Sequence, residues 1–282
     1  FALNNEGAIK TPHTSFDQYL ESEAALTNPQ RQEHPHAHQM MLDPSEIFCY
    51  VPDLGADLVR AYKFDAQQGV LSSISSASLK VADGSGPRHM VFHPTLSVCY
   101  VLNELLSTIT VCNFNITTGA LSHVKTFTTL PDSVKVGVDA ESACAAIRIL
   151  DSGKHLYCSN RGHDSIARFE VDDKGMLTFG EWTHTEGKCP RDFAIIDQKI
   201  IIVANQDSSS LTTFKIDTKT GKLESTVCAK MKLHRFSSSC NYFPFCSCSR
   251  SCSCSCACFW SSGLFLFIVF FLFFLFFLFF LF

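Results

Sequence analysis

The chain of 282 residues is long enough to bury the core of one or two domains. It is 46% apolar and 18% charged, with a formal net charge of −4 at neutral pH, whereas nucleic-acid binding needs clustered Lys and Arg. We therefore expect no nucleic-acid partner. The composition changes sharply near residue 235. We expect a globular domain at 1–235, a Ser/Cys-rich low-complexity segment at 236–262 and a Phe/Leu-rich apolar tail at 263–282.

The globular part contains an internal repeat of about twenty residues in four copies. Each copy begins with an apolar, β-branched run that ends at Asp or Asn, and these polar residues lie 50, 57 and 45 positions apart. A short turn and a strand of alternating apolar and polar residues follow, and a Gly closes the next turn. The copies run from Cys49 to Leu71, from Cys99 to Leu121, from Leu156 to Leu177 and from Ile201 to Leu223.

Each copy is preceded by one further strand, such as His89–Phe92, and followed by a stretch that can form a fourth, such as Ser122–Thr129. Four antiparallel strands in about 45–50 residues are typical of a β-propeller blade. Solenoid repeats would have helical spacing, which is not found, and immunoglobulin-like domains need about twice as many residues per unit. The sequence therefore predicts an all-β fold, a β-propeller of four-stranded antiparallel blades.

Four such blades are too few to close the usual ring, and the chain begins with Phe1 rather than Met. We therefore expect an incomplete ring with blades missing before Phe1. Residues 1–33 are interpreted as the outer strands and a long loop of an earlier blade.

The final segment is almost entirely Ser and Cys, then Phe and Leu. Residues 263–282 are apolar and long enough to span a bilayer, so one interpretation is a membrane anchor. Membrane helices, however, mix Leu with Val, Ile, Ala and Gly and place aromatic or basic residues at the interfaces. Ser, Cys, Phe and Leu share pyrimidine-rich codons. We therefore favour an aberrant tail read through from a pyrimidine tract, and expect membrane contact only if the tail exists in the cell.

Seven of the fourteen cysteines lie in that tail, and the other seven are scattered through the globular part without a CxxC pair. Cys49 and Cys99 occupy matching strand positions where the other copies carry Leu156 and Ile201. We expect them to be small core hydrophobes. Unpaired cysteines of this kind favour a reducing, cytoplasmic location.

Two sets of equivalent repeat positions are candidates for a binding site, because the innermost strand of a propeller blade lines a central channel and its entrance lies at one rim. A structural position would keep one residue type, whereas these positions vary and are rich in His, Arg and Glu. They hold His38, Arg88, Ala145 and Arg191 before the first strand, and Leu54, Glu104, Arg161 and Gln206 after the repeated Asp or Asn. The alternative is that they are ordinary solvated loop charges.

The segment His34–His38 carries His at three alternate positions. On an extended strand these side chains would share one side, which could bind zinc. The spacing supplies no further ligand, so we predict no metal. We predict instead that His36 or His38 acts as a general acid or base, which suits the ordinary histidine pKa near neutrality.

Arg88, Arg161 and Arg191 would place several guanidinium groups around the channel mouth. Arginine suits bidentate capture of phosphate or carboxylate, so we expect a small anionic ligand. Glu104 would be the lone acid among them, available for proton transfer or for orienting a hydroxyl group.

At these residues the sequence resembles the propeller lactonase family, a seven-bladed family that contains bacterial 6-phosphogluconolactonase and fungal 3-carboxy-cis,cis-muconate cyclase. The resemblance covers residues 1 to about 235. It is carried by His34-Pro35-His36, Tyr50–Asp57, Gly86–His89 with His93-Pro94, Asn103–Thr108, Ser159–Ile166 and Pro190–Phe193. A His, two Arg and a Glu form the proposed cyclase site, which the resemblance places at His36 or His38, Arg88, Glu104 and Arg161.

The resemblance implies hydrolysis of 6-phosphogluconolactone to 6-phosphogluconate without a cofactor. His36 or His38, helped by Glu104, would activate water. Arg88, Arg161 and Arg191 would bind the phosphate and stabilise the oxyanion. Two alternative functions remain open, because propellers have many functions. The protein could cyclise a carboxylated muconate to a lactone, or it could be a non-catalytic binding scaffold. Activity of this chain would depend on closure of the ring.

Overall fold

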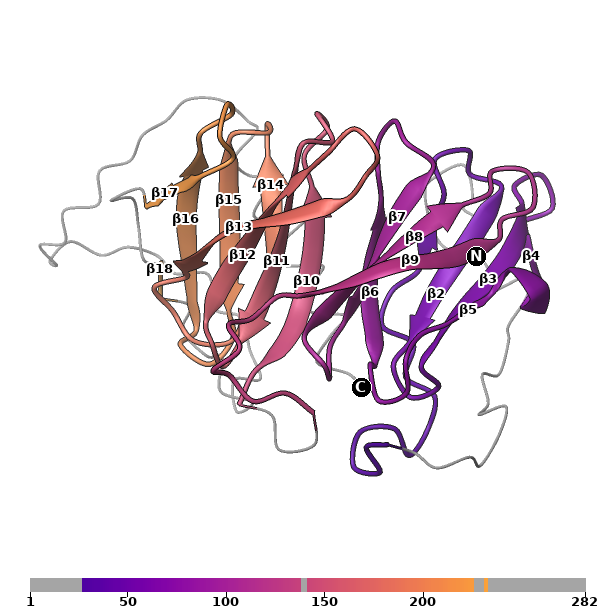
Figure 1. The fold of residues 1–282 in the computed structure, drawn as a ribbon, viewed down its shortest axis with the longest axis horizontal. Helices are drawn as coiled ribbons and strands as arrows, with labels where there is room; N and C mark the ends of the chain where they lie inside the picture. Colours follow the sequence, from indigo (N-terminus) through magenta and orange to yellow (C-terminus); the bar gives the residue numbers. More distant parts are fainter. Residues whose placement is uncertain (1–26, 138–140, 226–230, 233–282) are drawn as a thin grey trace, which may run out of the picture. The chain divides into compact units, whose positions relative to one another are not determined.

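The computed structural model describes residues 27–137, 141–225 and 231–232, which form four antiparallel β-sheets in succession along the chain (Figure 1). Within each sheet, four strands that are consecutive in sequence are neighbours, as in a meander, and two of the sheets carry one further short strand off this path. These sheets are the predicted four-stranded blades, and the prediction of an all-β propeller fold is confirmed.

The strands of the four blades have the following bounds. Blade 1 consists of β1 (Met41–Leu42), β2 (Phe48–Asp53), β3 (Leu58–Asp65) and β4 (Val70–Ser73), with a short 3₁₀ helix, η1 (Ser75–Ala77), and β5 (Leu79–Lys80), which pairs with β3. Blade 2 consists of β6 (Pro87–Phe92), β7 (Val98–Asn103), β8 (Thr108–Phe114) and β9 (Leu121–Thr128). Blade 3 consists of β10 (Ala143–Ile149), β11 (His155–Arg161), β12 (Ser165–Val171) and β13 (Leu177–His184). Blade 4 consists of β14 (Pro190–Ile196), β15 (Ile200–Asn205), β16 (Ser210–Ile216) and β17 (Leu223–Ser225), with β18 (Met231–Lys232) also paired to β16.

Successive blades pack face to face through apolar side chains, with one hydrophobic cluster between each neighbouring pair. Between blades 1 and 2, the rings of Tyr50, Phe92 and Phe114 lie 5.0–6.2 Å apart by their centroids. Cys49 and Cys99 are fully buried, as expected for small core residues. The first strands also meet, since β6 contacts β10 and β10 contacts β14. This contact places the first strands innermost, which is the radial arrangement of a propeller.

Tyrosine hydroxyl groups add a directed bond between blades. Tyr100 of blade 2 donates to the backbone carbonyl of Gly175 in blade 3 at 3.0 Å, and Tyr157 of blade 3 donates to that of Gly221 in blade 4 at 2.7 Å. Each acceptor is the Gly that closes a repeat turn. The repeat therefore encodes contacts between blades as well as the blades themselves.

In blades 1 and 3, the turn between the second and third strands also positions the next blade. Asp57 takes a left-handed backbone conformation (φ 51°), and its carboxylate accepts hydrogen bonds from the backbone N–H groups of Gly84 and Gly86, both at 2.7 Å. In the same way Asp164 (φ 53°) accepts one from the backbone N–H of Cys189 at 2.8 Å. Gly86 and Cys189 each lie two residues before an arginine of the candidate site. These turns therefore fix where β6 and β14 begin.

Residues 27–33 form a hydrogen-bonded turn and no strand, which is compatible with the long loop expected in this region. The interpretation of residues 1–33 as outer strands and a long loop of an earlier blade stays a prediction. The remainder of that region, 1–26, and the predicted segments 236–262 and 263–282 lie outside the described residues. None of the helices among the described residues has the length and apolar character needed to cross a bilayer.

Candidate active site

A β-bulge near the start of the innermost strand sets the direction in which the candidate side chains point. In β6, Pro87 pairs with Asn103 and His89 pairs with Leu102, so Arg88 is an extra residue without a partner across the strand. A bulge re-aims the side chain that it carries. Equivalent irregularities lie within residues 38–40 in blade 1, at Ala145 and Ala146 in blade 3 and at Arg191 in blade 4.

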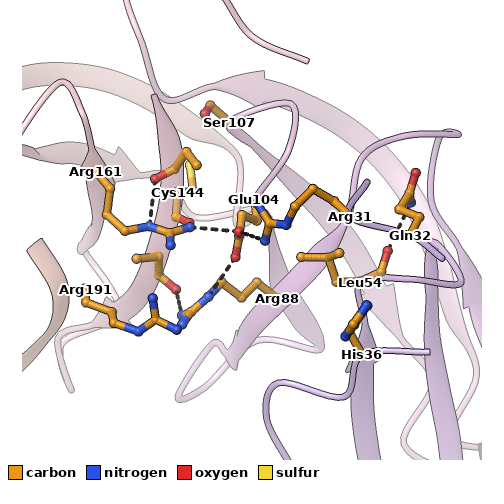
Figure 2. A network of polar contacts seen from close by, with 12 residues as sticks. Arg31, Gln32, His36, Leu54, Arg88, Glu104, Ser107, Cys144, Arg161 and Arg191 are labelled. Atoms are coloured by element: carbon orange, nitrogen blue, oxygen red, sulfur yellow. Dashed lines mark hydrogen bonds and ion pairs between the residues drawn. The ribbon is translucent and has the colours of Figure 1, made fainter. Parts of the chain in front are cut away.

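The centre of the site is the Glu104 carboxylate, which directly follows β7 and is only 1% exposed. Three guanidinium groups surround it (Figure 2). Nη2 of Arg31 lies 2.5 Å and Nη2 of Arg161 lies 2.9 Å from Oε1, while Nε of Arg88 lies 2.9 Å from Oε2. Burial alone would raise the pKa of Glu104, but the three guanidinium groups outweigh burial and lower this pKa to about 2. Glu104 is therefore ionised at neutral pH.

Arg88 is enclosed, with its side chain 2% exposed. Its Nη1 donates to the backbone carbonyl of Ala145, so blade 3 contributes a main-chain oxygen at the repeat position where it lacks a polar side chain. Nη1 also lies 3.1 Å from Nε2 of His89. Burial lowers the pKa of Arg88 to about 10, with Glu104 opposing the shift, so Arg88 stays charged at neutral pH.

His89 is a buried neighbour that the sequence analysis did not single out, although it directly follows Arg88. Burial and then the charge of Arg88 lower the pKa of His89 well below its usual value, so its ring is neutral. The contact with Arg88 makes Nε2 the acceptor and assigns the proton to Nδ1. Among the described residues, Nδ1 of His89 has no hydrogen-bond partner.

Arg161 and Arg191 are less enclosed than Arg88. The Arg161 side chain is 15% exposed, and its Nη2 also donates to the backbone carbonyl of Cys144 at 2.9 Å. Arg161 lines a cavity of about 320 Å³ together with Lys188. Arg191 donates to Oε1 of Gln206 at 3.2 Å and lies beside Arg88 in Figure 2.

The two candidate histidines have different surroundings. His38 is half-buried, and burial followed by the charge of Arg88 lowers its pKa to about 4, so the imidazole is neutral at neutral pH. The His36 side chain is 38% exposed, and its Nε2 lies 3.2 Å from Oε1 of Glu33. Both histidines line a cavity of about 140 Å³. In Figure 2, His36 lies on the far side of Leu54 from Glu104.

The structure thus brings three of the six predicted site residues, Arg88, Glu104 and Arg161, into direct contact. The charge of Arg88 lowers the pKa of His38, and the charge of Arg191 lowers the pKa of Arg88, so both residues lie near Arg88. His36 is paired with Glu33. Sequence reasoning missed Arg31 because it precedes the first repeat and has no equivalent in the other blades. Within the described ranges, no three His, Cys, Asp or Glu side chains gather in a way that could hold a metal ion.

Comparison with known proteins shows the family to which the chain belongs. A family model described as a seven-bladed β-propeller lactonase matches residues 1–233. The 6-phosphogluconolactonase of Bacillus subtilis (strain 168) is 35% identical over 228 residues, which are 79% of this chain and 61% of that protein.

Two solved structures are similar in fold as well as in sequence. The periplasmic gluconolactonase of Pseudomonas aeruginosa has a TM-score of 0.70 at 27% identity, over 80% of this chain and 61% of that one. A Lactobacillus plantarum protein has a TM-score of 0.71 at 31% identity, over 79% of this chain and 62% of that one. The chain thus spans about three fifths of the length of these relatives, and its described residues form four blades. The chain belongs to the seven-bladed β-propeller lactonase family.

Proposed function

We propose that the protein hydrolyses a sugar lactone, 6-phosphogluconolactone, to 6-phosphogluconate at the arginine cluster around Glu104. The observation that carries the proposal is the buried Glu104 carboxylate, which holds three guanidinium groups beside a neutral histidine. Membership of the lactonase family and the similarity to the Bacillus subtilis enzyme support the same reaction class.

The arginine cluster carries three guanidinium groups on one carboxylate, and this excess of positive charge favours an anionic substrate. Arg161 and Arg191 are the arginines on the side of blades 3 and 4. Arg161 also lines the cavity of about 320 Å³, which has the volume of a small-ligand site and whose lining includes Lys188 and three acidic residues, Glu141, Asp164 and Asp207. Arginine binds phosphate through two parallel hydrogen bonds. We therefore assign the phosphate of the substrate to this side of the cluster.

His38 is the group best suited to activate water. Its imidazole is neutral at neutral pH and can take a proton from a water molecule that attacks the lactone carbonyl carbon. The resulting tetrahedral intermediate collapses as the ring C–O bond breaks, and the ring oxygen takes up a proton to become a hydroxyl group. Glu104 is too acidic, and too fully paired with arginine, to accept that proton. Its proposed role is to position the guanidinium groups.

The test is acid release from 6-phosphogluconolactone by the purified full chain, with the spontaneous rate subtracted. His38→Gln should lower kcat about 100-fold because the general base is lost. Lys125→Gln, on exposed β9, should leave kcat unchanged. Because His38 acts as a neutral base, kcat/KM should stay level from pH 8 to about 5 and fall as the pH drops through about 4. If acid is released no faster than in the spontaneous reaction, the proposal is overturned. Turnover of 3-carboxymuconate instead would favour the cyclase reaction.

We also propose a cytoplasmic location. The six cysteines among the described residues are free, and five of them are buried, which suits a reducing compartment. Cell fractionation with an antibody against the blade region would test this location, and recovery outside the cytoplasm would contradict it.

A further inference from the structure

Arg31 is the most exposed of the three guanidinium groups that contact Glu104. Its side chain is 46% exposed, compared with 15% for Arg161 and 2% for Arg88. Guanidinium has five N–H donors, and only Nη2 of Arg31 is engaged by the Glu104 carboxylate. Among the described residues, no other side chain or carbonyl engages the remaining donors of Arg31, so these donors can bind a ligand without repacking of this part of the chain.

The segment that carries Arg31 is held in place by buried polar residues. The backbone N–H groups of Arg31 and Gln32 both donate to the carbonyl of Asn28, at 3.0 and 2.9 Å, which forms a tight turn. The Gln32 side chain accepts from the backbone N–H of Asn28 at 3.1 Å and donates to the carbonyl of Leu54 at 3.0 Å. Gln32 is 1% exposed and Asn28 is 5% exposed. The turn therefore presents Arg31 from a defined position on blade 1.

Arg31 shares a small cavity with the proposed general base. It lines the cavity of about 140 Å³ together with His36, His38 and Leu54, whereas Arg161 lines the separate cavity of about 320 Å³. Because both arginines contact Oε1 of Glu104, the carboxylate lies between the two cavities. A volume of 140 Å³ is below that of a typical small-ligand site and suits one end of a ligand.

We propose that Arg31 is a catalytic residue that binds the lactone carbonyl oxygen and stabilises its developing negative charge. This inference rests on the proposed lactonase function. The reacting end of the substrate would lie in the small cavity, where His38 delivers water and Arg31 binds the oxyanion, and the phosphate would lie toward Arg161. After ring opening, the same guanidinium would hold the carboxylate of the product. Glu104 keeps Arg31 oriented before the reaction, so little reorganisation is needed when the charge appears.

The test separates the two ends of the ligand with two probes. 6-Phosphogluconate carries a phosphate and a carboxylate, whereas glucose 6-phosphate carries the same phosphate but no charge at the other end. Calorimetric titration of the full chain should show that Arg31→Gln weakens 6-phosphogluconate binding on the order of tenfold or more and leaves glucose 6-phosphate binding unchanged. Arg31→Lys should weaken it less, because the charge remains.

Turnover gives the second measurement. Removing one oxyanion donor typically lowers kcat on the order of 100-fold, so Arg31→Gln should lower kcat for the lactone much more than it raises KM. Lys80→Gln is the matched control, since Lys80 is an exposed cation of blade 1 paired with Asp83 at 3.4 Å, and it should change neither value.

The outcomes distinguish the two proposals. Suppose that the wild type hydrolyses the lactone. If Arg31→Gln then weakens the binding of both probes equally, or leaves kcat unchanged, the role of Arg31 is overturned and the lactonase function is kept. Arg31-dependent binding of 6-phosphogluconate without hydrolysis by the wild type would overturn the lactonase function and keep Arg31 as a carboxylate-binding residue. Failure of the wild type to bind either probe would overturn the role of Arg31.

Discussion

Blades 2 and 4 place an arginine and a polar partner at the same two repeat positions, but the two pairs differ in burial. In blade 2, Arg88 and Glu104 form an ion pair at 2.9 Å with side chains 2% and 1% exposed. In blade 4, Arg191 donates to Gln206 at 3.2 Å, and both remain accessible to solvent. A carboxylate at the second position attracts further guanidinium groups that cover it, whereas a neutral amide does not. The same repeat position therefore holds a buried, ion-paired arginine in blade 2, Arg88, and an arginine that a ligand can reach in blade 4, Arg191.

Glu104→Gln should have the largest effect, because it turns the blade 2 pair into the kind found in blade 4. Arg88 would remain buried without a compensating charge, and breaking a buried pair in this way costs about 3 kcal/mol of unfolding free energy. Urea denaturation followed by fluorescence would measure the loss. The equivalent control in blade 4, Gln206→Ala, should change stability by less than about 0.5 kcal/mol. Similar losses in the two variants would contradict the distinction between the blades.

The acid sensitivity of blade 2 should be intermediate in size. Glu104 has a pKa of about 2 in the folded chain, compared with an ordinary value of 4.5. A depressed pKa stabilises the folded state above pH 4.5, and this stabilisation is lost as the pH falls from 4.5 toward 2. The stability advantage of the wild type over Glu104→Gln should therefore shrink across that window. Gln206→Ala should keep the wild-type pH dependence, and a constant advantage of wild type over Glu104→Gln would contradict the depressed pKa.

The smallest expected effect concerns the contact between blades. Tyr100 of blade 2 bonds to the Gly175 carbonyl, but the equivalent residue of blade 4 is Ile202, which has no hydroxyl group. Tyr100→Phe should lower the unfolding free energy by about 1 kcal/mol, since one hydrogen bond is lost while the ring stays packed. Thermal denaturation would measure the shift. No shift would mean that blade packing alone holds this interface.

The repeat was enough to predict the blades, because its signals are local. Alternation of apolar and polar residues sets which side of a strand is buried, and Gly or Asp at fixed places sets the turns, as Asp57 and Gly119 do. The same register predicts that Arg88, Glu104 and Arg161 are neighbours. The turn at residues 27–33 could not be predicted in this way, because that segment belongs to no repeat and is held by hydrogen bonds of the buried Gln32 side chain to the backbone of Asn28 and Leu54.

The order of residues by itself determined the four-stranded units, their hairpins and the set of positions that meet near the start of each innermost strand. Only the tertiary structure decided that Arg88 is enclosed while Arg191 is accessible, that the charges of Arg88 and Arg191 reach His38, and that Arg31 joins the cluster. The physical reason is that strand and turn patterns depend on neighbours along the chain. Burial and charge pairing depend instead on distances between side chains far apart in sequence, such as the 2.5 Å between Arg31 and Glu104.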